Sequence, residues 1–177
     1  RPAVVQRRSL RRLYRPPCPG HLLNLINQLL DISKLEGGQM QVETKHGDIV
    51  AFTKNLFDRL EPLAQQKKQT LLFSADPTIW KTYFDEKKWQ KITFNLLSNA
   101  IKFTPKGGQI ELSLAQVTIK QQDTIQLIVK DNGVGIKATN LKNLFNRFYQ
   151  VDGTTTRVQE GTGIGLSLVK ELIELQG

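Results

Sequence analysis

The segment Asn95-Leu-Leu-Ser-Asn99-Ala-Ile-Lys102-Phe103-Thr-Pro105 constrains the fold most, because it predicts one helix with two different faces. At about 100° of turn per residue, Asn95, Asn99 and Lys102 share one stripe of that helix. The neighbouring stripe is apolar and holds Trp89, Ile92, Leu96, Ala100 and Phe103. Such a helix can pack against a core and still present polar groups to a ligand.

The polar stripe has the chemistry of a magnesium and phosphate site. Amide oxygens are hard ligands that suit Mg²⁺, so Asn99 and Asn95 are candidate metal ligands. Lys102, one turn further on, can meet a phosphate as a point charge. The same stripe is also compatible with the solvated face of an ordinary amphipathic helix.

A glycine segment, Asp131-Asn132-Gly133-Val134-Gly135-Ile136, follows the β-branched run of residues 124–130, which predicts a strand leading into a turn. We expect the Asp131 carboxylate to be buried there, where it can accept a hydrogen bond from an exocyclic amine such as that of adenine. Gly133 and Gly135 would let the backbone approach a ligand closely. Asp-Asn-Gly is equally an ordinary turn sequence.

A second glycine segment, Glu160-Gly161-Thr162-Gly163-Ile164-Gly165-Leu166, leads into residues 167–176, whose apolar positions have helical spacing. A glycine loop at a helix N-terminus has the geometry of an anion-binding site. Its glycine spacing matches neither the dinucleotide-binding fingerprint nor the lysine-ended phosphate loop.

Residues 151–160, between the two glycine segments, are polar and lack an apolar period, which predicts a mobile lid. Arg157 is the candidate phosphate contact within this lid. The aromatic residues Phe145 and Phe148 come just before it, and we expect both to pack in the core, as most aromatic side chains do.

Taken in this order, the motifs strongly resemble those of the ATP-binding catalytic domain of two-component sensor histidine kinases, in the GHKL (Bergerat-type) ATPase superfamily. The resemblance covers about residues 21–177. It includes residues 21–38, which are similar to the second helix of the family's dimerisation and phosphoacceptor hairpin.

The resemblance implies ATP and Mg²⁺ as ligands. It implies that Asn99 binds magnesium with support from Asn95, that Lys102 contacts phosphate and that Asp131 binds the adenine amino group. Gly133 and Gly135 would shape the adenine side, and Phe103 and Ile136 would line it. The second glycine segment would hold the phosphates as the lid closes, through Gly161, Thr162, Gly163, Gly165 and Leu166.

The family's phosphoacceptor box, a histidine followed by an acidic residue and an Arg-Thr-Pro segment, has no match here. His21 stands at the predicted start of the hairpin helix, and we expect His46 to lie in a loop. We therefore expect the chain to bind ATP without phosphorylating itself. We also expect the terminal strands of the family's sheet to be missing, which makes the chain a fragment of a longer kinase.

The net charge of +9 is concentrated at the N-terminus, where six arginines and no acidic residue occupy residues 1–20 and leave +3 for residues 21–177. We interpret this arm as a disordered or non-native leader, and expect no specific nucleic-acid binding. The single Cys18 fits a reducing, cytoplasmic compartment, although the parent protein can be membrane-anchored elsewhere. No apolar run approaches the roughly 20 residues that span a bilayer.

These patterns predict an α+β fold, a two-layer sandwich with helices on one face of a mixed sheet, preceded by one hairpin helix. We divide the chain into the basic arm (1–20), the hairpin helix (21–40) and the ATP-binding domain (41–177). Asp48 and Asp85 are expected helix caps. The expected strands are residues 40–44, 70–74, 80–84, 109–115 and 124–130.

The implied function is to bind magnesium-ATP and to present the γ-phosphate to a histidine of the parent sensor kinase. The implied partners are a second protomer, through the hairpin helices, and the receiver domain of a response regulator. Two alternatives stay open: a noncatalytic module whose interactions depend on nucleotide, and an ATPase of the chaperone, topoisomerase or mismatch-repair branch.

Overall fold

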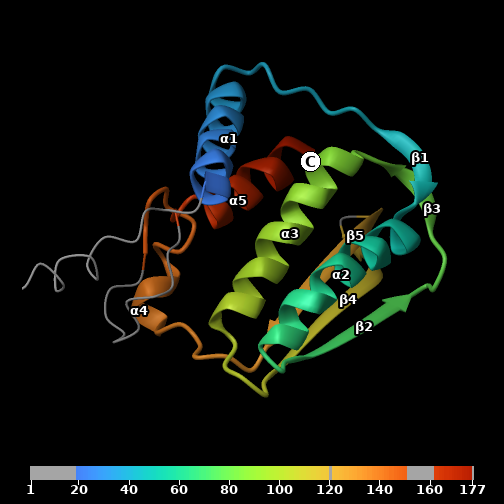
Figure 1. Cartoon of the computed structure of the whole chain (residues 1–177). Helices are drawn as coiled ribbons and strands as arrows, with labels where there is room; N and C mark the ends of the chain where they lie inside the picture. The colour runs from blue at the N-terminus through green and yellow to red at the C-terminus, as the bar shows by residue number, and fades with distance from the viewer. Residues whose placement is uncertain (1–18, 120, 151–161, 177) are drawn as a thin grey trace, which may run out of the picture.

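A computed structural model describes residues 19–119, 121–150 and 162–176 of the chain. The elements run in the order α1 (Pro19–Glu36), β1 (Lys45–Asp48), α2 (Ile49–Gln66), β2 (Thr70–Asp76), β3 (Lys81–Phe84), α3 (Glu86–Phe103), β4 (Gln109–Ile119), β5 (Gln122–Asp131), α4 (Ala138–Leu141) and α5 (Gly165–Gln176) (Figure 1). None of the described helices is long and apolar enough to cross a membrane.

The larger sheet has the strand order β2-β4-β5 and is mixed, because β2 is parallel to β4 while β4 is antiparallel to β5. Its register sets Thr70 opposite Gln109 and Ile110 opposite Asp131, so the strand ends that matter for the site lie together. β1 and β3 form a separate antiparallel pair instead of joining this sheet. Both are four residues long and lead directly into the capped helices α2 and α3.

Helices α2 and α3 lie across one face of the β2-β4-β5 sheet, which confirms the predicted α+β class (Figure 1). The core between the two layers is largely apolar. Its largest fully buried side chains come from α2, α3 and β4: Ile49, Leu56, Leu97, Ile101, Ile110 and Leu112. Trp89 and Ala100 of the predicted apolar stripe belong to this core, together with Leu97 and Ile101 of the same helix. Ile92 and Leu96 of that stripe pack in a second cluster instead, and Phe103 is exposed.

A second apolar cluster joins α1, α3 and α5, which lie side by side (Figure 1). Ile32 of α1 packs with Ile92 of α3, and with Ile164, Leu168 and Leu172 at and beyond the start of α5. This cluster positions the beginning of α5 against the middle of α3, where the candidate ligands of the polar stripe lie.

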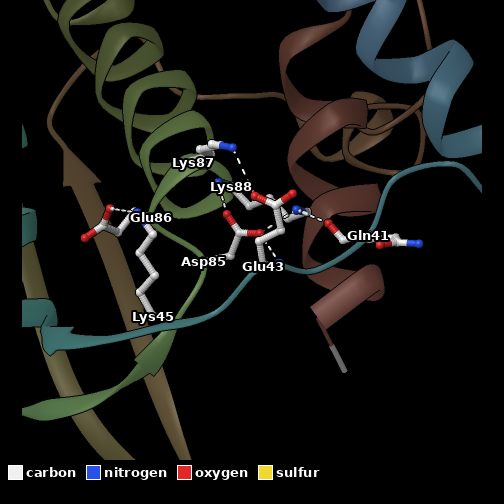
Figure 2. A network of polar contacts seen from close by, with 7 residues as sticks. All are labelled: Gln41, Glu43, Lys45, Asp85, Glu86, Lys87 and Lys88. Atoms are coloured by element: carbon white, nitrogen blue, oxygen red, sulfur yellow. Dashed lines mark hydrogen bonds and ion pairs between the residues drawn. The ribbon is translucent and has the colours of Figure 1, made fainter.

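The linker between α1 and β1 is not the strand predicted for residues 40–44. Its backbone groups bond to side chains at the start of α3: the N–H of Glu43 donates to Asp85 Oδ2 (2.8 Å), and Lys88 Nζ donates to the carbonyl of Gln41 (2.6 Å) (Figure 2). The alternation of Met40 and Val42 was a correct sign of an extended chain. The linker has no partner strand, because the side chains of Asp85 and Lys88 form its hydrogen bonds.

The predicted helix starts are confirmed at Asp48, which accepts hydrogen bonds from Val50 N and Ala51 N, and at Asp85, which accepts one from Lys88 N. α1 ends at Glu36, just before Gly38 takes the left-handed conformation with φ of 62°. The expectation of a loop at His46 was wrong, because this residue lies in β1. Its ring meets the Tyr83 ring edge-on, with 5.1 Å between the two ring centroids.

Candidate nucleotide-binding site

The asparagine stripe of α3 meets the second glycine segment. Asn95 Nδ2 donates to the carbonyl oxygen of Lys91 one turn earlier (2.8 Å), which fixes the orientation of the carboxamide. A Cβ built on Gly165 would lie 2.8 Å from Asn95 Oδ1, so only glycine leaves that oxygen its space. Asn99, one turn further along α3, is half-buried. The structure thus brings together two motifs that are 70 residues apart in the sequence.

The first glycine segment is fixed to the other end of α3. The N–H of Val134 donates to the carbonyl of Phe103, the last residue of the helix (3.4 Å). A Cβ on Gly133 would lie 2.6 Å from that same oxygen, and Gly135 has a φ of 66°. Both glycines are therefore required by the backbone, the first by close approach and the second by its conformation.

Asp131 is exposed, contrary to the expectation of a buried carboxylate. It is the last residue of β5, which is an edge strand of the β2-β4-β5 sheet, so only one neighbouring strand flanks it. Asp131 Oδ1 accepts a hydrogen bond from Gly133 N (2.9 Å), and Phe103 and Ile136 are also exposed. The Asp131 carboxylate and the side chains of Phe103 and Ile136 thus lie at the end of α3 and in the loop that is bonded to it. Such a set of groups can bind a flat heteroaromatic ring.

Lys102 is half-buried, with its ammonium 4.7 Å from the centroid of the Phe103 ring. Burial lowers the pKa of Lys102, and the positive charge of Lys67 lowers it further. The charged form is thus less favourable here than in water, and an anionic ligand would offset that cost.

The second glycine segment is shaped by contacts on both sides of it. Gly163 has a φ of 69°, its carbonyl accepts a hydrogen bond from Phe148 N (2.9 Å), and a Cβ on it would lie 2.7 Å from the Phe148 backbone. Thr162 Oγ1 donates to Gln28 Oε1 of α1 (3.0 Å) and accepts from Ile164 N (3.2 Å). Leu166 is half-buried in the first turn of α5. Arg157 and Gly161 lie outside the described residues.

The prediction that Phe145 and Phe148 pack in the core was wrong, since they are 46% and 63% exposed. Residues 142–148 form turns after the short helix α4, so they present no continuous apolar face to the core. Sequence patterns also did not indicate the role of Arg147, which forms ion pairs with Glu36 of α1 and Glu171 of α5. These contacts hold the loop against two helices that are distant from it in sequence.

The donor set fits magnesium better than a metal that prefers nitrogen or sulfur. The described part of the chain contains no group of three His, Cys, Asp or Glu side chains that could hold a metal ion. The site instead offers the carboxamides of Asn95 and Asn99 on α3, and Asn95 lies beside Gly165 at the start of α5. Mg²⁺ takes a few protein oxygens and completes its shell with water and phosphate oxygens.

Comparison with known proteins identifies the class to which this site belongs. The profile of the histidine kinase-, DNA gyrase B- and HSP90-like ATPases matches residues 84–177, more than half of the chain. The chain therefore belongs to this family. Within it, the chain is a protein histidine kinase catalytic domain of the kind found in two-component signalling, because its curated relatives are named as such kinases.

Three relatives illustrate the match. The chain is 34% identical over 158 residues to histidine kinase P4 of Formosa agariphila, 37% over 154 residues to the sensor histidine kinase TmoS of Ectopseudomonas mendocina, and 31% over 156 residues to WalK of Bacillus subtilis. The alignments cover 87–88% of this chain but only 11%, 15% and 25% of those proteins. The chain thus spans a minor part of the relatives' length.

Solved structures share the fold. Full-length ShkA in complex with AMPPNP superposes with a TM-score of 0.75 at 24% identity, over 88% of this chain and 31% of ShkA. The catalytic domain of the histidine kinase ThkA gives a TM-score of 0.64 at 20% identity, over 76% of this chain and 83% of that domain. The α+β architecture expected from the sequence is the one these kinases have.

Proposed function

We propose that the chain binds magnesium-ATP between the polar stripe of α3 and the two glycine segments. The observation that supports this most strongly is the approach of Gly165 to Asn95 Oδ1, since it sets a helix N-terminus beside an oriented amide oxygen. In this proposal Asp131 accepts the adenine amino hydrogen and Lys102 meets a phosphate. Asn99 holds magnesium, with Asn95 in support.

The ligand roles follow from what each group can donate or accept. A carboxylate accepts hydrogen bonds only, so Asp131 selects a base with an exocyclic amine at that position. The first turn of α5 offers backbone N–H groups that have no partner within the helix, and these groups suit phosphate oxygens. Bound magnesium would neutralise phosphate charge, while Asn95 and Asn99 would fix its orientation.

We further propose that the bound ATP is the phosphoryl donor for a histidine on the parent kinase, and that this acceptor lies outside the present chain. Phosphoryl transfer needs positioning and charge neutralisation more than covalent chemistry from the protein, and the residues of this site supply both. Because ATP is the proposed donor, we place the domain in the cytoplasm. Acid-labile radiolabel on the chain after incubation with γ-labelled ATP would contradict the absence of an acceptor.

One face of α1 is suited to packing against another helix. Leu23, Ile26 and Leu30 follow a spacing of three and four residues and are all exposed, while Ile32 of the same helix is buried against α5. We propose that this exposed stripe packs against the other helix of a hairpin and against a second protomer. We also propose that the assembled kinase passes its phosphoryl group to the receiver domain of a response regulator.

Calorimetric titration with AMPPNP and Mg²⁺ tests the nucleotide site. Asn99→Ala and Asp131→Asn should each weaken binding roughly tenfold or more, because each removes a group that bonds to a charged or polar ligand atom. Asn55→Ala, on the exposed side of α2, and Asp123→Asn, exposed on β5, are matched controls that should bind like the wild type.

Loss of affinity in the two site variants but not in the controls would establish the site. Equal affinity in all five proteins would mean that the nucleotide binds elsewhere. A folded wild-type chain that does not bind AMPPNP at all would refute the proposed function of this chain.

A further inference from the structure

The end of α3 that carries Lys102 is held by a segment much earlier in the sequence. Lys67, which follows α2, donates from Nζ to the carbonyl oxygens of Ile101 (2.8 Å) and Lys102 (3.2 Å). Gln69, which precedes β2, donates from Nε2 to the carbonyls of Ile101 (3.0 Å) and Thr104 (2.6 Å). None of these contacts is evident from the asparagine motif itself.

These bonds occupy the positions where a helix needs them. The last carbonyl groups of an α-helix have no partner within the helix, and they carry the negative end of its dipole. A lysine ammonium at this end is therefore favourable in two ways, through its hydrogen bonds and through its charge. The carbonyl of Phe103 accepts from Val134 N, so the last three carbonyls of α3, those of residues 101–103, all accept hydrogen bonds from groups in other segments.

The segment that supplies these donors is itself well anchored. Gln69 N donates to the carbonyl of Ala64 (3.0 Å), and Thr70 N donates to that of Gly108 (2.9 Å). Gly107 N donates to the carbonyl of Lys68 (3.0 Å), which ties the turn after α3 to the same segment. Gln69 is also buried, so its carboxamide is confined by its surroundings.

We propose that Lys67 is a positioning residue for the phosphate side of the nucleotide site, with Gln69 as its buried support. Lys67 donates to the backbone carbonyl of Lys102, so it helps to fix the backbone from which the Lys102 side chain extends. This inference rests on the proposed function, because it assigns Lys67 a role in binding through Lys102. Burial lowers the pKa of Lys102 and the charge of Lys67 lowers it further, so a bound anion would stabilise the charged form of Lys102.

A role in helix capping alone would lower stability without distinguishing between ligands. The test therefore compares AMPPNP with Mg²⁺ against adenosine, which lacks phosphate, for the full chain. Lys67→Met should weaken AMPPNP binding roughly tenfold, as for a lost bond to a charged group, and leave adenosine affinity unchanged. Lys67→Arg retains charge and donors and should restore AMPPNP binding. Lys68→Met removes a neighbouring charge from the same turn and is the matched control.

A double-mutant cycle with Lys102→Met identifies the route of the effect. If Lys67 acts through Lys102, Lys67→Met should have little further effect on AMPPNP binding in the Lys102→Met background. The same loss in both backgrounds, or an equal loss for AMPPNP and adenosine, would overturn the inference. Circular dichroism checks that each variant is folded, and Lys67→Gln, which keeps a donor without the charge, replaces Lys67→Met if that variant unfolds.

The outcome for the wild type separates this inference from the proposed function. A wild-type chain that binds AMPPNP, with Lys67→Met binding equally well, overturns only the positioning role. A folded wild-type chain that does not bind AMPPNP refutes the nucleotide site, and the role of Lys67 with it.

Discussion

Replacing Asp85 with alanine should destabilise the chain far more than the loss of a helix cap. Asp85 is 1% exposed and accepts hydrogen bonds from Glu43 N, Lys88 N and Lys88 Nζ (Figure 2). Lys88, which is only 6% exposed, would keep its bond to the Gln41 carbonyl but lose its counter-charge. The substitution therefore removes a cap, removes one of the hydrogen bonds that join the linker to α3, and leaves a buried cation unpaired.

The magnitude follows from these separate losses. A lost N-cap costs about 1 kcal/mol, and breaking a buried ion pair from one side costs roughly 3–5 kcal/mol. Since the two effects share hydrogen bonds and do not simply add, we expect a loss of roughly 4 kcal/mol for Asp85→Ala. That is a large part of the roughly 5–15 kcal/mol that stabilises a typical domain.

Urea unfolding followed by circular dichroism measures the effect. Asp48→Ala is the matched control, because Asp48 is the N-cap of α2 in the same extended backbone conformation and has no buried cation beside it. This substitution should cost about 1 kcal/mol. Adding Lys88→Met to Asp85→Ala should recover part of the stability, since no buried charge is then left unpaired. Equal losses for Asp85→Ala and Asp48→Ala would refute this reasoning.

The same network predicts a pH dependence. Burial by itself raises the pKa of Asp85, but the hydrogen bonds from Lys88 and from the Glu43 amide outweigh it, and the pKa is lowered in the folded chain. The stabilisation by the carboxylate is therefore present above the ordinary pKa of an aspartate and is lost as the pH falls through the folded pKa. The stability difference between the wild type and Asp85→Asn should narrow in acid, and a constant difference would contradict the assignment.

Two further predictions concern the nucleotide site. Lys102→Met should weaken AMPPNP binding without lowering the melting temperature, because the positive charge that it removes is partly desolvated and lies near the charge of Lys67. Lys106 is nearby in the sequence and exposed, so Lys106→Met should change neither the affinity for AMPPNP nor the melting temperature. Gly165→Ala should weaken magnesium-dependent binding by displacing the Asn95 carboxamide at little cost in stability, since a side-chain end can shift. A thermal melt beside a titration checks both, and a large loss of stability in either variant would count against this account.

The sequence was most informative where chemistry and local conformation coincide. Asp48 and Asp85 cap their helices as predicted, because a capping aspartate acts on backbone amides two or three residues away. Gly135 and Gly163 adopt the left-handed conformation that makes glycine useful, so the residue types alone were enough to place both motifs on loops.

Prediction failed where the answer depends on a distant partner. Residues 40–44 have an extended pattern, but only the position of Asp85 and Lys88 shows that side chains complete their hydrogen bonds. Lys67 lies 34 residues before the Ile101 carbonyl to which it donates, and nothing in its local sequence indicates that bond. The burial of Asp131 was overestimated because strand order, and therefore edge position, is not visible in a single strand.

Hydrogen–deuterium exchange of the wild-type chain with and without AMPPNP and Mg²⁺ tests the central claim most directly. We predict slower exchange in three separate segments, residues 95–104, 131–136 and 162–166, with no change in β1 and β3. Protection confined to another surface, such as the groove lined by Phe52, Asn55 and Arg59 of α2, would contradict the claim that the asparagine stripe and both glycine segments form one nucleotide site.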